Sequence, residues 1–76
     1  MWWFLEKQLD DPVGVVYSYG YESKEQTGKI FYNRKEDKCD VLVAADNDWN
    51  PRRVCAYLRN IVIKENAPQI RQIATG

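Results

Sequence analysis

Tyr17, Tyr19 and Tyr21 occupy every second position of a stretch that follows a run of valines. Aromatic side chains spaced in this way along a strand point to one side of a sheet, where they can stack on the bases of single-stranded nucleic acid. Lys29 and Arg34, in the next apolar segment, would supply positive charge for the phosphates. The pattern predicts, as one alternative, a nucleic-acid face made of these five residues.

Two features of the sequence weigh against nucleic acid. The segment 28–32 lacks the spaced glycines and aromatics of the RNA-recognition motif, and acidic residues surround it. Eleven basic residues balance eleven acidic ones, so the chain has no overall positive field. We expect the tyrosines to form a wall of the hydrophobic core, with their hydroxyl groups at its rim.

The chain has two cysteines, Cys39 and Cys55, and no histidine. The two cysteines are too far apart for a Cys-x-x-Cys motif, and no histidine can activate either one. We expect Cys39 in a connection, and Cys55 on the helix, buried and inert beside the apolar stripe. So few cysteines favour a reducing compartment, and the apolar start of the chain is interrupted at Glu6 and Lys7, so we expect a cytoplasmic protein with no membrane segment.

Asp46, Asp48 and Asn50 stand at alternate positions, as at the start of a calcium-binding loop. The match fails because Pro51 takes the glycine position and Tyr57 takes the position of the bidentate glutamate. We therefore expect a structural turn and no metal.

Arg52 and Arg53 could hold a phosphate at a helix N-terminus, but cations oppose the helix dipole there. A solvated cluster in which they pair with Asp46 and Asp48 is the simpler expectation. The sequence also has no glycine-rich phosphate loop, no nucleophile elbow and no carboxylate within an apolar run. We expect no enzymatic activity and no cofactor.

Hydrophobic periodicity defines the elements that must position these residues. Alternating or continuous apolar runs predict strands over residues 2–9, 15–22, 29–35 and 40–45. A helix follows, with Asn50 as N-cap and Pro51 at the first helical position, and it ends at Ala67 and Pro68. Its apolar stripe consists of Val54, Leu58, Ile61 and Val62.

The predicted fold class is α+β, an antiparallel four-stranded β-meander followed by one C-terminal α-helix packed on one sheet face. Residues 1–76 form a single domain, with residues 67–76 as a loosely ordered tail. Ile70 and Ile73 suffice for one short turn in that tail but not for an independent element.

Apolar residues occur on both parities of three predicted strands, although one helix covers only one face of a sheet. Curling of the sheet and ordinary surface exposure could absorb the excess, or another chain could cover it. With the tyrosines facing the helix, Ser18 and Gly20 should leave room on the opposite face. That face would carry the candidate contacts Trp2, Phe4 and Phe31, to which the helix adds Ile63.

The sequence thus predicts a small non-enzymatic interaction module that self-associates, as a homodimer, or binds another protein through an aromatic sheet face. The alternative is single-stranded nucleic-acid binding by the tyrosine-rich hairpin.

Overall fold

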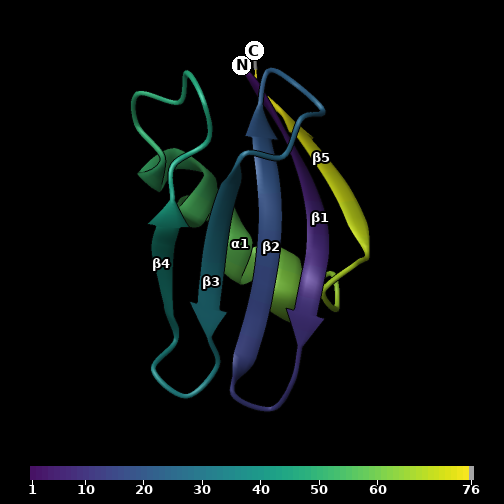
Figure 1. The fold of residues 1–76 in the computed structure, drawn as a ribbon. Coiled ribbons are helices and arrows are strands. Elements are labelled where there is room, and N and C mark those ends of the chain that lie inside the picture. The colour runs from purple at the N-terminus through teal and green to yellow at the C-terminus, as the bar shows by residue number, and fades with distance from the viewer. Residues whose placement is uncertain (76) are drawn as a thin grey trace.

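The computed structural model describes residues 1–75, which form one antiparallel sheet and one helix (Figure 1). The sheet order is β4-β3-β2-β1-β5. The helix lies behind the sheet in Figure 1 and covers what we call the inner face; the opposite side is the outer face. The predicted α+β class is confirmed. The elements are β1 (Trp2–Asp10), β2 (Gly14–Tyr21), β3 (Gly28–Asn33), β4 (Lys38–Val43), α1 (Arg52–Ile63) and β5 (Ile70–Ala74).

The sheet has five strands where four were predicted, because β5 pairs antiparallel with β1. Ile73 lies opposite Trp3 and is buried in the core, whereas Ile70 is exposed. The loose tail predicted for residues 67–76 is therefore wrong over β5, and Gly76 lies outside the described residues. Pairing with the free edge of β1 satisfies the backbone of β5, which local apolar spacing does not reveal.

The inner face and the apolar stripe of α1 form the core. Tyr17 and Tyr19 are fully buried there, which confirms that the tyrosines form the wall beneath the helix. Their hydroxyl groups reach acceptors at the rim: Tyr17 donates to the Pro68 carbonyl oxygen, and Tyr19 donates to Asp48 Oδ2 at 3.1 Å. The other large, fully buried core side chains are Trp3, Leu5, Val15, Ile30, Val54, Leu58 and Ile61.

Helix α1 is shorter than predicted and begins without a side-chain cap among the described residues. Pro51 holds the cap position, so the prediction of Asn50 as N-cap is wrong. The Asn50 backbone N–H instead donates to Asp48 Oδ1 at 3.2 Å. After the helix, Asn66 and Ala67 adopt left-handed φ values of 61° and 49°, which turn the chain towards β5.

Cys39 and Cys55 form a disulfide that joins β4 to α1, with a Cα–Cα distance of 5.7 Å. Cys55 is buried, as predicted, but it is not inert, and Cys39 lies within β4, opposite Tyr32 on β3, and not in the predicted connection. Disulfides persist mainly in oxidising compartments. The cysteines therefore no longer support the predicted cytoplasmic location.

Two irregularities in the sheet change which side chains reach the outer face. The register shifts between Lys7 and Leu9 in the β1–β2 pair, so Leu9 lies opposite Val16. It shifts again between Lys29 and Ile30 in the β3–β4 pair, so Val43 lies opposite Lys29. A bulge adds one residue to one strand and reverses the facing of everything beyond it.

Candidate functional site

The outer face is ordered by the strand register into rows of side chains. One row contains Ile70, Glu6, Ser18, Lys29 and Val43, from β5 to β4. Successive residues in a row lie on neighbouring strands, about 4.8 Å apart. In this row two apolar residues lie at the ends, and two opposite charges flank the central serine.

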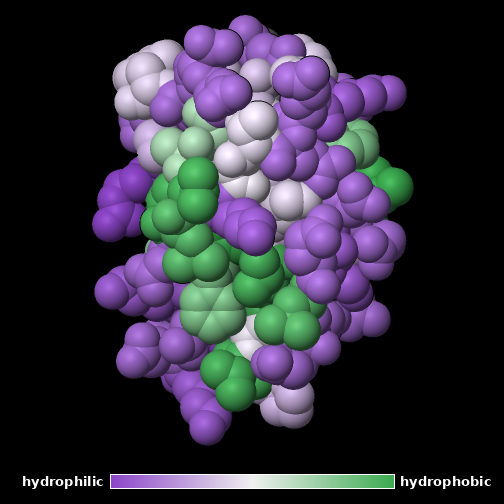
Figure 2. Space-filling model, in the orientation of Figure 1, coloured by the Kyte–Doolittle hydropathy of each residue, from purple (hydrophilic) through white to green (hydrophobic). Residues whose placement is uncertain are grey.

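A second row, which includes the residue beyond the register shift in β1, contains Leu9, Val16, Phe31 and Asp40, from β1 to β4. Leu9 is 52% exposed, and Val16 and Phe31 are half-buried. Figure 2 shows a continuous hydrophobic stripe that crosses the sheet on this side. We call it the outer stripe and assign to it the apolar residues that the strand register places on this part of the face: Leu9, Val16, Phe31 and Val43.

The β2–β3 loop, residues 22–27, folds back over the part of the outer face next to Gly20. A Cβ atom at Gly20 would collide with the backbone oxygens of Ser23 and Glu25. The Ser18 hydroxyl is buried and bonded to Gln26 Oε1, and Gln26 Nε2 donates to Glu6 Oε1 at 2.9 Å. The open space predicted beside Ser18 and Gly20 is therefore wrong, because the loop fills it.

The four predicted contact residues do not form one patch. Trp2 and Phe4 lie on the outer face at the end where the loop packs, and the Lys24 ammonium lies 6.0 Å from the Phe4 ring centroid. Phe31 lies in the outer stripe, beyond the row that contains Ser18. Ile63 is 53% exposed on α1, the helix that covers the inner face.

The residues of the nucleic-acid alternative are also separated. Tyr17 and Tyr19 have no exposed surface, so no base can stack on them in this fold. Lys29 points to the outer face, opposite to theirs. Arg34 Nη1 forms an ion pair with Asp10 Oδ1 at 2.7 Å, and this pairing lowers the pKa of the Asp10 carboxyl.

Tyr21 belongs to a cluster around Arg53 at the rim of the inner face. The Arg53 guanidinium lies 5.2 Å from the Tyr21 ring, 5.5 Å from the Trp3 ring and 4.2 Å from the Trp49 ring. Asp48 holds it through an ion pair of 3.1 Å. Cation–π contacts of this kind orient the exposed Trp49, whose relative exposure is 75%.

Asp48 is a buried carboxylate with four partners. Oδ1 accepts from Arg53 and from the Asn50 backbone N–H, and Oδ2 accepts from Tyr19 and from the Trp3 indole at 3.4 Å. Burial raises the pKa of Tyr19 to about 12, and the neighbouring Asp48 adds to the increase. The predicted pairing of Arg53 with Asp48 is confirmed, but the carboxylate is enclosed and not part of a solvated cluster. Buried charges require such pairing.

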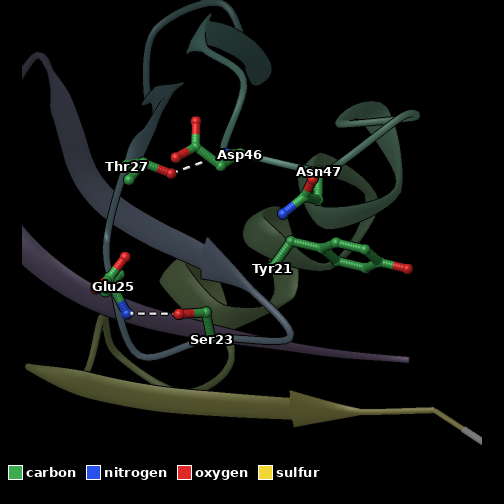
Figure 3. Close-up of a pocket in the computed structure, with 6 residues that line it drawn as sticks. All are labelled: Tyr21, Ser23, Glu25, Thr27, Asp46 and Asn47. Carbon is green, nitrogen blue, oxygen red and sulfur yellow. Dashed lines mark hydrogen bonds between the residues drawn. The ribbon is translucent and has the colours of Figure 1, made fainter.

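A recess of ≈ 100 Å³ lies between the β2–β3 loop and the segment after β4 (Figure 3). Thr27 Oγ1 accepts from the Asp46 backbone N–H at 2.8 Å, and Ser23 Oγ accepts from the Glu25 backbone N–H at 3.0 Å. The first bond joins the two segments, and the second lies within the β2–β3 loop. Small-molecule sites usually enclose about 300–1,000 Å³, so the recess is small for one.

Residues 1–75 contain no cluster of three or more metal-ligating side chains. Among the same residues, no helix is both long and apolar enough to cross a membrane. Comparisons with protein-family models, with curated proteins and with solved structures find no match to this chain. The candidate site that geometry leaves is the outer stripe.

The sequence pointed to the correct face of the sheet but not to the residues that form its exposed centre. Leu9 and Val43 shared a parity with core residues, and the two register shifts moved them to the outer face. The sequence carries no signal that places those shifts. The burial of Asp48 and the stacking of Trp49 on Arg53 were missed, because neither shows in the sequence of a polar loop.

Proposed function

We propose that this chain is a small non-enzymatic interaction module that binds protein through the outer stripe. The observation that supports it is a continuous apolar surface on the side of the sheet that α1 does not cover (Figure 2). Phe31 provides an aromatic anchor at its centre, and Lys29 borders it as a polar rim. Apolar centres with polar rims are typical of protein interfaces.

A photoreactive phenylalanine analogue can test the proposal directly. Placed at Phe31, it should crosslink to protein in an extract of the source cells and in the purified protein, and excess unlabelled chain should compete. The control carries the analogue at Tyr57, an aromatic residue on α1 that is 38% exposed. Crosslinking from Phe31 no stronger than from Tyr57 would refute binding through the outer stripe.

A further inference from the structure

β4 lies at one edge of the sheet and is held only weakly by burial (Figure 1). Its six residues are half-buried or exposed, whereas β2 buries most of its side chains. Cys39 and Val41 pack against the core as partly buried residues, but Leu42 and Val43 are about half exposed. Within the sheet, β4 pairs with β3 alone. An edge strand of this kind depends on further contacts to keep its place.

A disulfide and an ion pair join the start of β4 to α1. The disulfide links Cys39 to Cys55. Arg59, one turn further along α1, pairs with Asp37 just before β4 at 2.8 Å. Both side chains of the ion pair are at least half exposed, so it contributes little to stability. The covalent bond is therefore the stronger of the two attachments.

β4 also completes the outer stripe on the other side of the sheet. Val43 belongs to the stripe, and Asp40 lies opposite Phe31 on β3. Cys39, in contrast, lies opposite Tyr32, whose side chain is buried in the core. If β4 leaves the sheet, Val43 leaves the stripe and Phe31 becomes a residue of an edge strand. A bond on the inner face thus holds together a surface on the outer face.

We infer that the Cys39–Cys55 bond is a redox switch, whose reduction by a dithiol releases β4 from α1 and weakens binding at the outer stripe. The effect on binding rests on the proposed function. Cys39 is half-buried and Cys55 is 8% exposed, so the dithiol attacks the Cys39 sulfur. The S–S bond breaks, and Cys55 leaves as a thiolate that takes up a proton. The second thiol of the reductant then displaces Cys39, which also becomes a thiol, and the reductant is oxidised to a cyclic disulfide.

Amide hydrogen exchange, followed by NMR with and without dithiothreitol, tests the release of β4. With the bond intact, β4 leaves the sheet only together with α1, so its protected amides should exchange about as slowly as those of the β1–β2 pair. After reduction, β4 opens by itself, and its protection should fall at least about tenfold relative to the β1–β2 pair. Mass spectrometry confirms the gain of two hydrogen atoms. An unchanged ratio, whether the whole chain loosens or none of it does, would overturn the switch.

Arg59→Gln is the matched control, because it removes the ion pair with Asp37 and keeps the disulfide. Its β4 amides should stay protected without dithiothreitol. If they exchange as fast as in the reduced wild type, the ion pair holds β4 and the disulfide is not the switch.

The effect on binding is measured with the photoreactive analogue at Phe31 in the Cys39→Ser/Cys55→Ser chain, which cannot form the bond. Its crosslinking yield should be at least about threefold lower than that of the wild-type chain in the same extract, because fewer molecules carry a complete stripe. Equal yields, both stronger than from Tyr57, would overturn the regulation and leave the proposed function standing. Crosslinking from Phe31 no stronger than from Tyr57 in either chain would overturn the proposed function, whereas the exchange experiment tests the release of β4 without any partner.

Discussion

The inner and outer faces of the sheet are made by the same strands but are completed in different ways. On the inner face, α1 and the tyrosine wall leave no apolar surface exposed at Tyr17, Tyr19 or Leu58, and the tyrosine hydroxyls find acceptors. On the outer face, Leu9 and Val43 remain about half exposed. Burial within the chain therefore accounts for stability on the inner face, whereas apolar side chains stay exposed on the outer face.

Leucine substitutions separate the two faces most strongly. Leu58→Ala should lower the free energy of unfolding by about 2–5 kcal/mol, because it leaves a cavity in the closed core. Leu9→Ala should change it by less than about 0.5 kcal/mol, since that side chain is half exposed in the isolated chain. Urea unfolding at low protein concentration measures both. Equal losses would show that the outer face is also part of the core.

The disulfide should make the next largest contribution to the free energy of unfolding, because it attaches the edge strand β4 to α1. It closes a loop between positions 16 residues apart. Cys39→Ala/Cys55→Ala should lower the free energy of unfolding by about 3 kcal/mol through the freer unfolded chain. Denaturant midpoints with and without a reducing agent provide the check. Only the wild type should respond to the reductant; a wild type insensitive to it would contradict the prediction.

Tyr19→Phe should have a smaller effect on the same face. It removes the hydroxyl that donates to Asp48 and accepts from the Ala45 backbone N–H at 3.1 Å. The Asp48 carboxylate and the Ala45 backbone N–H then each lose one hydrogen-bond partner. This should lower the free energy of unfolding by about 1–3 kcal/mol. Tyr57→Phe, which alters a part-exposed ring, should have almost no effect. Thermal unfolding compares the two, and equal stability would argue against the Asp48 network.

The alkaline titration of the tyrosines also distinguishes the faces. Burial raises the pKa of Tyr17 and of Tyr19 to about 12, above the ordinary value of 10.0. The unfolded chain releases these protons near pH 10 and the folded chain keeps them, so this stabilisation is complete below pH 10 and is lost as the pH rises to 12. Tyrosinate absorbance should show Tyr17 and Tyr19 among the late-titrating residues, together with Tyr32, whose pKa is raised by its hydrogen bond to Asp37. Ionisation of Tyr17 and Tyr19 near pH 10 in the folded chain would contradict a closed inner face.

Periodicity predicted the elements that local sequence controls. Alternation identified β2, and the spacing of Val54, Leu58 and Ile61 identified the stripe of α1, because both patterns record which side chains face one core. β5 could not be predicted in this way, since its two isoleucines point to opposite faces. It is a strand only because β1 offers an edge.

The candidate site was predicted only in outline for a related reason. Phe31 was recognised because its strand has regular parity up to that point. Leu9 and Val43 follow register shifts, which depend on how two strands fit together. Gln26 holds the loop over Gly20 by hydrogen bonds to Ser18 on β2 and Glu6 on β1. Because these contacts join residues far apart in the sequence, no local pattern predicts that the loop covers the outer face near Phe4.

The most direct test of the outer stripe is the photoreactive analogue at Phe31. It should crosslink to protein more strongly than the same analogue at Tyr57 on α1, and excess unlabelled chain should compete. Crosslinking from Phe31 no stronger than from Tyr57 would contradict the account.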